Sequence, residues 1–239
     1  MNSTKIKRGS RKGDNGRLLI IGGSIEYPGA VALAGMAALR AGCDYVTIAA
    51  PEQVAWTVNT ICPDLVTLKC KGDYLTRQEG ILEREYDAVL IGNGLGKKGI
   101  PFARRIIPRI KTSLVIDGDA IGCISLDKLN DTLLTPHLGE YQRLKGAIGT
   151  NTILLKGPVD QIITRKRTYK NHTGNSYMTK AGTGDVLAGL CAGLRSLGYS
   201  ALQSARKAAY INGKAGESLN RPFLASELLE EISNLLNET

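Results

Sequence analysis

Short apolar runs alternate along this chain with longer stretches of helical spacing, and this alternation most limits what the chain can fold into. The first run, RLLIIGG at 17–23, ends in glycines and is followed by the alanine-rich stretch GAVALAGMAALRAG at 29–42. Short apolar runs predict buried strands, and their alternation with helices predicts a largely parallel sheet with helices on both faces. Residues 1–239 are therefore expected to form a single α/β domain.

The same alternation continues to the end of the chain. Expected strands lie at 17–23, 44–51, 86–96 (running into a glycine turn), 113–121, 132–136 and 152–157, with a hairpin at 161–171 that turns near 165–167. Expected helices lie at 29–42, 52–63, 100–111, 185–198, 201–219 and 225–238. In sheets of this kind ligands bind beyond the carboxyl ends of the strands, so the glycine turns and polar motifs found there mark the expected cleft.

The charge of the chain favours an anionic ligand. Lys and Arg number 31 against 22 Asp and Glu, a net charge of +9, which suits either nucleic acid or a polyanionic small substrate. Aromatic residues make up only 5%, and no zinc-finger spacing, basic helix or RNA-binding signature occurs, so nucleic acid is not expected. Five widely spaced cysteines without a C-x-x-C pair predict core thiols in a reducing cytosol. Neither a signal peptide nor a run of membrane-spanning length is present, so a cytoplasmic protein that does not bind membranes is predicted.

The stretch TKAGTGDVLAGL at 179–190 sets a glycine-rich turn before an apolar helix. Such a turn at a helix N-terminus suits a phosphate, which Asp185 would repel. One interpretation makes Asp185 the N-cap of the helix. The other makes it a general base: backbone N–H groups at 181–184 hold a phosphoryl group in transfer, while Asp185 takes the proton of the accepting hydroxyl.

Three more motifs place polar side chains at strand ends. His137 and Glu140 follow a proline in LLTPHLGEY and fit either a ligand site or a hydrogen-bonded turn that starts a helix. Lys156 ends the run LLKG, where it could contact phosphate or remain a solvated turn residue. Asp117 and Asp119 in DGDA could bind a metal ion as a pair or could serve as capping and turn residues.

The sequence does not decide whether two further glycine-rich turns bind a ligand or are only structural. IGGSIEYPGA at 21–30 and IGNGLG at 91–96 lack both the dinucleotide fingerprint and the P-loop pattern. Each either lets a ligand approach the backbone or lets the chain turn tightly into the next element.

Taken in order, these motifs resemble the ADP-dependent NAD(P)H-hydrate dehydratase family. The resemblance rests on KGDNGRLLIIGGSIEYPGAVALAGMAALRAG, VLIGNGLG, LVIDGDAI, LLTPHLGEYQRL, LLKG and GNSYMTKAGTGDVLAGLCAGL, which together span nearly the whole chain. It implies a ribokinase-like α/β fold without the lid of the sugar kinases. It also implies a repair reaction in which ADP (or ATP) phosphorylates the hydroxyl of hydrated NADH or NADPH (NADHX, NADPHX), with Mg2+ assisting. Phosphate then leaves, so that the products are NAD(P)H, AMP and phosphate.

The resemblance also implies roles for individual residues. Asp185 would be the catalytic base, beside an anion hole formed by Gly182, Thr183 and Gly184. The nucleotide would be bound by Lys156, Gly157, Pro158, Val159, Asp160 and Gly184. The hydrated dinucleotide would be bound by Ala30, Gly94, His137 and Asp185. Glu140 and Asn175 would lie near the phosphates or their hydrated metal ion, and the relatives lead us to expect a homo-oligomer, either a dimer or a tetramer.

Five positions depart from the family pattern. Asn93 stands where the family usually has proline, Gly118 stands for alanine, and Asp160 stands for threonine, which puts a hydroxyl contact to the nucleotide in doubt. Lys180 and Ala181 stand where small residues or glycine are usual, and Lys180 could add a phosphate contact.

Two other functions remain as alternatives to the dehydratase. One is a small-molecule kinase of the same fold, such as a hydroxyethylthiazole kinase, because the G-T-G-D turn serves that chemistry too. The other is a nucleotide-binding regulator without catalysis. The motif order favours the dehydratase.

Overall fold

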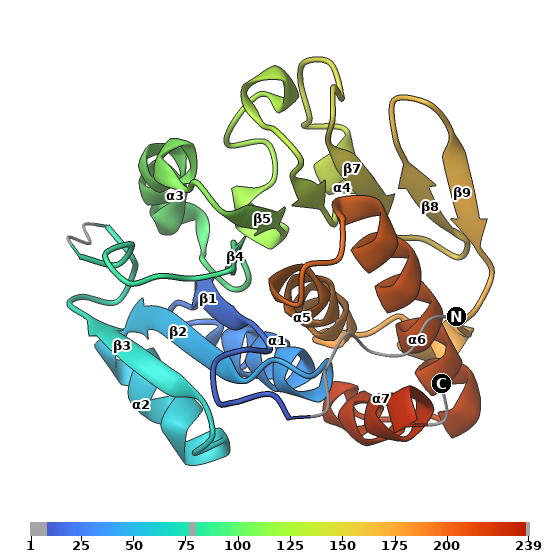
Figure 1. Ribbon diagram of the computed structural model, residues 1–239, viewed down its shortest axis with the longest axis horizontal. Coiled ribbons are helices and arrows are strands. Elements are labelled where there is room, and N and C mark those ends of the chain that lie inside the picture. Colours follow the sequence, from blue (N-terminus) through green and yellow to red (C-terminus); the bar gives the residue numbers. More distant parts are fainter. Residues whose placement is uncertain (1–8, 77–79, 238–239) are drawn as a thin grey trace.

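Nine strands form one sheet in the computed structural model of the chain, which describes residues 9–76 and 80–237 (Figure 1). Their order across the sheet is β3-β2-β1-β4-β5-β6-β7-β8-β9. Pairing is parallel from β3 to β7 and antiparallel from β7 to β9, so the expected largely parallel sheet is confirmed. The strands are β1 (Arg17–Ile21), β2 (Tyr45–Pro51), β3 (Val66–Cys70), β4 (Ala88–Ile91), β5 (Ser113–Ile116), β6 (Leu133–Leu134), β7 (Thr152–Leu155), β8 (Asp160–Ile163) and β9 (Thr168–Asn171).

Helices cover both faces of this sheet, as the alternating pattern predicts. Successive strand residues point to opposite faces, so Leu18 and Ile20 join one core while Leu19 and Ile21 join the other. The first core lies under α1, α5, α6 and α7, and the second lies under α3, which Figure 1 shows on the opposite side of the sheet from α1 and α5. The helices are α1 (Pro28–Arg40), α2 (Glu52–Ile61), α3 (Ile100–Ile106), α4 (Leu138–Tyr141), α5 (Thr183–Ser196), α6 (Ala201–Leu219) and α7 (Leu228–Asn237).

Two elements of the fold were not expected from the sequence. The strand β3 forms an edge of the sheet, and most of its side chains are at least partly exposed, so it lacks the apolar run of a buried strand. The helix α4 has only four residues, which is too short for a helical period to show.

The strands β4 and β5 end earlier than the expected ranges 86–96 and 113–121. Gly92 follows β4 with a φ of +121°, and a Cβ atom at this position would lie 1.9 Å from the carbonyl oxygen of Asp117. Each strand therefore ends in a sharp turn, and the two turns pack directly against each other. This close approach of two backbones requires glycine at position 92.

The cysteines agree with the expected core thiols. All five are free, with Cys43, Cys70 and Cys191 buried and Cys62 and Cys123 partly buried. Among the helices in the described part of the chain, none combines the length and apolar character needed to cross a membrane.

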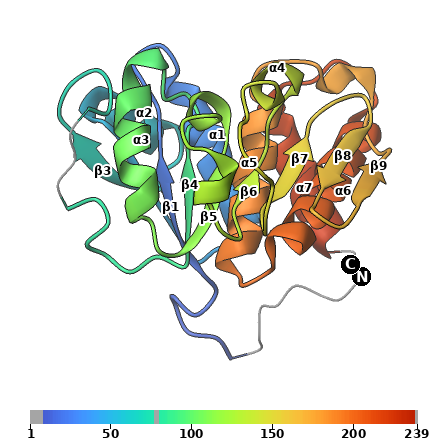
Figure 2. The ribbon, with the colours of Figure 1, turned by 90° about the horizontal axis from the view of Figure 1, so that it is seen from above.

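The polar motifs gather at the carboxyl edge of the parallel strands. Figure 2 shows α4 above the ends of β6 and β7 at this edge. The turns after β4, β5 and β7 reach the first turn of α5 through hydrogen bonds between their side chains. A site at this edge therefore draws its residues from segments that are far apart in sequence.

Candidate functional site

A continuous chain of hydrogen bonds links four side chains at the carboxyl edge. Lys156 Nζ lies 2.9 Å from Asp117 Oδ1, and Asn93 Nδ2 donates to Asp117 Oδ2 at 2.9 Å. The same Asn93 nitrogen donates to Asp185 Oδ1 at 2.7 Å. These residues follow β7, β5 and β4 and lie in the first turn of α5, so the fold brings together the lysine and the aspartate that the sequence marks as candidates.

Asp117 is buried among hydrogen-bond donors. Only 4% of the residue is exposed, and Oδ1 also accepts a hydrogen bond of 2.7 Å from the hydroxyl of the buried Thr135. Burial alone would lower the pKa of Lys156, but the charge of Asp117 and its hydrogen bond outweigh burial, so this pKa is raised. Lys156 therefore keeps its positive charge at the point where β7 ends.

Asp185 is not the N-cap of α5. Gly182, with a φ of +95°, is the N-cap of α5, and Asp185 lies in the first turn beyond it. The N-cap interpretation of Asp185 is therefore wrong. Burial and the charge of Asp117 raise its pKa to about 7, against the opposing effects of Asn93 and Lys156. A carboxylate with a pKa near neutrality is suited to take up a proton.

The expected anion hole coincides with the first turn of α5. The leading N–H groups of a helix have no partner within the helix, and the helix dipole makes this end partially positive. The Thr183 hydroxyl donates to the carbonyl oxygens of Met178 and Lys180, so what Thr183 can offer an anion is its backbone N–H. A Cβ atom on Gly184 would lie 3.4 Å from Lys156 Nζ, which shows how close the lysine comes to this turn.

The expected nucleotide segment, residues 156–160, forms the turn from β7 to β8. Its N–H at Gly157 donates to Asp160 Oδ1 at 3.2 Å, and Asn171 Nδ2 donates to Asp160 Oδ2 at 3.2 Å. Asp160 thus closes this turn with Oδ1 and ties it to β9 with Oδ2, and burial raises the pKa of Asp160. Pro158 is exposed and Val159 is partly exposed.

Two of the expected substrate residues touch each other. Gly94 has a φ of +59°, and a Cβ atom there would lie 2.9 Å from the Cβ of Ala30 and 2.7 Å from the carbonyl oxygen of Tyr27. The turn after β4 therefore packs against the start of α1, next to Asn93.

His137 and Glu140 form a reciprocal cap at the start of α4. His137 Nδ1 accepts from the N–H of Gly139 at 3.0 Å, and Glu140 Oε2 accepts from the His137 N–H at 2.9 Å. Burial raises the pKa of Glu140, whereas the His137 side chain is 62% exposed. His137 also forms a backbone bridge to Lys156, so the histidine lies beside the expected nucleotide segment.

The remaining candidates have structural partners. Asn175 Oδ1 accepts from the Tyr177 N–H, and its Nδ2 donates to the Gly216 carbonyl at 2.6 Å. Lys180 Nζ contacts the Phe223 carbonyl and lies 4.8 Å from the centre of the Phe223 ring, so its ammonium group has a partner within the protein.

Asp117 and Asp119 do not form a metal pair. Asp119 Oδ2 accepts from the N–H of Gly96, while Asp117 pairs with Lys156. Over residues 9–76 and 80–237, no three or more His, Cys, Asp or Glu side chains cluster in a way that could hold a metal ion.

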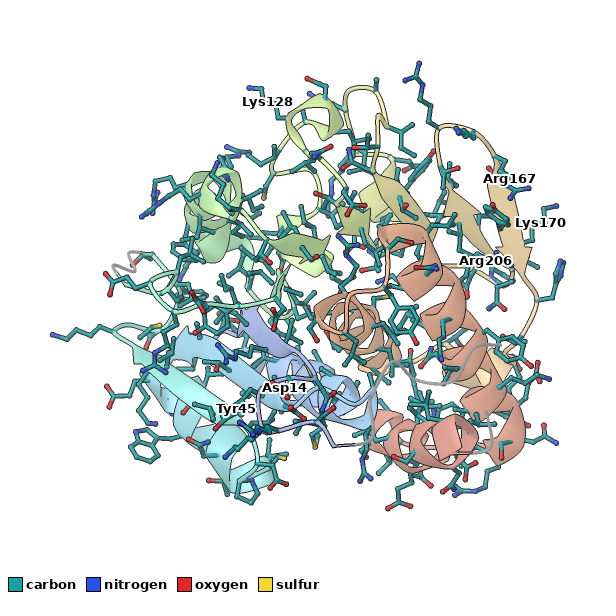
Figure 3. The ribbon with its side chains drawn as sticks, in the orientation of Figure 1. Asp14, Tyr45, Lys128, Arg167, Lys170 and Arg206 are labelled. Carbon is teal, nitrogen blue, oxygen red and sulfur yellow. The ribbon has the colours of Figure 1, made fainter. Side chains whose placement is uncertain are left out.

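A group of basic residues lies at the outer edge of the sheet, on α6, on β9 and in the turn that leads into β9. Figure 3 labels Arg167, Lys170 and Arg206 there, and the two arginines lie 4.5 and 4.6 Å from the centre of the Tyr169 ring. The positive charge of the chain is therefore spread beyond the carboxyl edge of the parallel strands.

The sequence did not assign Asp117, Asn93 and Thr135 to the site. Asp117 was marked only as part of a metal pair, and Asn93 only as an unusual residue within a glycine turn. A carboxylate and a lysine that each end a strand of one parallel sheet are a usable signal, because such ends meet at one edge. No comparable signal identifies Thr135.

The chain is similar to known proteins over most of its length. A family model described as NAD(P)H-hydrate dehydratase matches residues 18–237. The chain is 36% identical to an ADP-dependent (S)-NAD(P)H-hydrate dehydratase of Cenarchaeum symbiosum, over 89% of this chain and 84% of that protein. It also matches bifunctional NAD(P)H-hydrate repair enzymes, of whose length it spans about half.

Solved structures share its fold. The ADP/ATP-dependent NAD(P)H-hydrate dehydratase of Bacillus subtilis, co-crystallized with ATP/Mg2+, has a TM-score of 0.85 at 25% identity, covering 98% of this chain and 93% of that one. A ribokinase-like superfamily protein of Enterococcus faecalis has a TM-score of 0.84 at 23% identity, covering 99% and 92%. The expected ribokinase-like fold is confirmed. With the match over residues 18–237, these findings lead to one conclusion: the chain belongs to the NAD(P)H-hydrate dehydratase family.

Proposed function

We propose that this protein dehydrates the hydrates of NADH and NADPH at the expense of ADP. The observation that carries the proposal is the position of Asp185 in the first turn of α5, where a carboxylate with a raised pKa adjoins unpaired helix N–H groups. Membership of the family and the relative named an ADP-dependent (S)-NAD(P)H-hydrate dehydratase support the choice of substrate and nucleotide.

The proposed reaction has two steps. In the first, the hydroxyl oxygen of the hydrated nicotinamide ring forms a bond to the terminal phosphorus of ADP, and the bond from that phosphorus to the bridging oxygen breaks. AMP leaves, and Asp185 takes the hydroxyl proton. In the second step, the bond from the ring carbon to oxygen breaks and phosphate leaves with that oxygen and its electron pair. The neighbouring ring carbon gives up a proton to solvent, and the electron pair of that C–H bond forms the restored double bond.

The chain's own residues supply binding and charge for the first step. We assign the transferring phosphoryl group to the N–H groups of residues 182–184, with Lys156 adding a positive charge. The nucleotide is assigned to residues 156–160 together with Gly184. Ala30, Gly94 and His137 are assigned to the hydrated dinucleotide. Ala30 lies in the first turn of α1 and His137 caps α4, while Gly94 follows Asn93, the residue that is hydrogen-bonded to Asp185.

A hydrated magnesium ion fits this set of residues better than a directly bound one. Mg2+ in nucleotide sites keeps several waters and draws its other ligands from phosphates and one or two carboxylates. Glu140 supplies a buried carboxylate, and Asn175 has both of its amide atoms in use, so we propose that both residues reach the ion through water. When bound, the ion would neutralise part of the phosphate charge.

ADP is the proposed co-substrate, although the B. subtilis relative is named for both ADP and ATP. A predicted homo-oligomer and a predicted cytoplasmic location complete the proposal.

The decisive experiment incubates the protein with NADHX, ADP and Mg2+ and follows the absorbance band of NADH. We expect the band to rise only when nucleotide is present, with AMP and phosphate formed in equal amounts. Folded protein that produces no NADH with either ADP or ATP would overturn the proposal.

The kinase alternative is tested in the same experiment. A hydroxyethylthiazole kinase would consume ATP when given its vitamin precursor and would leave NADHX unchanged. A regulator would bind nucleotide, as measured by calorimetry, without consuming it.

A further inference from the structure

Asn93 stands between the two carboxylates of the site. It is 1% exposed, and its Nδ2 donates to Asp117 Oδ2 at 2.9 Å and to Asp185 Oδ1 at 2.7 Å. Its backbone is fixed as well, because its carbonyl accepts from the Gly23 N–H at 2.8 Å. The side chain therefore starts from a rigid position within the turn after β4.

The chemistry of an amide determines which way Asn93 must point. The NH2 group has two protons and meets two carboxylates, one for each proton. Asn93 Oδ1 is buried and has no hydrogen-bond partner among the residues that the structure describes. Exchanging the two amide atoms would turn a carbonyl oxygen toward the oxygen atoms of both carboxyl groups, so electrostatics favours the observed orientation.

This bond makes the two oxygens of Asp185 unequal. Oδ1 accepts the Asn93 proton, whereas Oδ2 takes no hydrogen bond from any other described residue. The carboxylate is thus held at one oxygen and is available at the other.

We propose that Asn93 is a positioning residue for Asp185: it holds Oδ1 and so presents Oδ2 as the oxygen that accepts the proton. This inference rests on the proposed dehydratase reaction. The proton moves from the substrate hydroxyl to Asp185 Oδ2 as that hydroxyl oxygen bonds to phosphorus and the phosphorus bond to the AMP oxygen breaks. Asn93 itself touches neither substrate nor nucleotide in this proposal.

Charged groups from several elements act on Asp185 and define what Asn93 contributes. Asp117 after β5 and Glu140 on α4 repel its charge, while Lys156 after β7 attracts it. Burial and Asp117 together raise the pKa of Asp185 to about 7, and the Asn93 hydrogen bond opposes that rise. Removing the amide therefore both frees the carboxylate to rotate and favours its protonated form.

The test replaces Asn93 with leucine, which has a similar shape and no donor, and with alanine, which leaves space without strain. The acid limb of the pH profile of kcat/KM and the 13C carboxyl titration of Asp185 are recorded for each variant. A hydrogen bond to a charged group contributes enough to move a pKa by about one unit. We expect both titrations to move up by about one pH unit and kcat at pH 8 to fall roughly tenfold to a hundredfold, with KM little changed.

Thr135→Val is the matched control. It removes a hydrogen bond from Asp117 Oδ1 but leaves the bond between Asn93 and Asp185 in place. We expect it to leave the carboxyl titration of Asp185 within a few tenths of a unit of wild type. A shift in Thr135→Val as large as in the Asn93 variants would overturn the inference, since the effect would then come through Asp117.

The outcomes separate this inference from the proposed function. If wild-type protein forms no NADH from NADHX, the proposed function fails, and the inference built on it fails too. If wild type is active but the folded Asn93 variants keep its kcat or its Asp185 titration, the inference alone fails. Melting temperatures identify folded variants, and the alanine variant decides the matter if the leucine variant does not fold.

Discussion

Lys156 and Asp117 form an ion pair, with 2.9 Å between Nζ and Oδ1, and their side chains are only 20% and 5% exposed. Because Asp117 also takes hydrogen bonds from Thr135 and Asn93, it is the one group on which the lysine, the amide and a hydroxyl of the site all converge. The stability of the folded protein and the charge distribution of the site therefore both depend on this carboxylate.

Removing the lysine alone leaves a buried charge without its counter-ion. We expect Lys156→Met to lower the free energy of unfolding by about 3 kcal/mol, since breaking one partner of a buried pair is strongly destabilising. The double variant Lys156→Met/Asp117→Asn restores a large part of that loss because no charge remains unpaired. Urea denaturation at pH 8 measures both, and equal stabilities for the single and double variants would contradict the expectation.

Asp185→Asn separates catalysis from stability. We expect the rate of NADH formation to fall by roughly 10²- to 10⁴-fold, the usual contribution of a general base, with ADP binding retained in calorimetry. A pKa raised from 3.8 to about 7 means that the ionised form is disfavoured in the folded chain, so stability is lost as pH rises between these values.

The amide of that variant does not ionise, so it avoids this loss. Above pH 7 we expect Asp185→Asn to be more stable than wild type by about 1 kcal/mol or more, since one unit of pKa shift corresponds to about 1.4 kcal/mol. A variant that is less stable than wild type at pH 8 would argue for a structural role of the carboxylate.

The reaction should depend on pH through Asp185. A base works only in its ionised form, so kcat/KM is expected to be constant above the pKa of about 7 and to fall about tenfold per pH unit below it. Initial rates between pH 5.5 and 9, with protein shown to be folded across the range, provide the measurement. A profile that stays flat down to pH 5.5 would exclude Asp185 as the base.

A substitution at Gly92 tests how tightly the turns after β4 and β5 pack against each other. Its φ of +121° and the 1.9 Å approach to the Asp117 carbonyl oxygen leave no room for a methyl group. We expect Gly92→Ala to destabilise the protein by roughly 2–4 kcal/mol and to disturb Asn93 and Asp117 together.

Gly157→Ala is the control for that change. A Cβ atom there meets only the Val159 carbonyl oxygen, at 3.6 Å, so the substitution should leave the melting temperature near that of wild type. Similar melting temperatures for Gly92→Ala and Gly157→Ala would show that the close contact at Gly92 carries little energy.

The sequence predicts a strand or helix of this fold only where its hydrophobic pattern is strong. The buried strand β1 and the alanine-rich helix α1 have strong patterns and were predicted within a few residues. The edge strand β3 and the four-residue helix α4 have no such pattern, because exposure and shortness remove it.

The residues of the candidate site also differ in how clearly the sequence marks them. Asp185 and Lys156 stand in local motifs whose chemistry can be recognised, and the structure brings them within one hydrogen-bonded chain. The residues next to Asn93 in the sequence do not indicate its contacts, because its two carboxylate partners lie 24 and 92 positions away. Distances of that kind are set by the topology of the sheet and not by neighbouring residues.

The wide spacing of the contacts made by Asn93 has a consequence for synthesis on the ribosome. A nascent chain acquires Asn93 and Asp117 early and can form their turn as β4 and β5 pair, but Asp185 emerges much later. Until then the amide has only one of its two carboxylates. The growing polypeptide therefore lacks the complete hydrogen-bonded chain for a long interval, and premature termination before α5 would release fragments without Asp185.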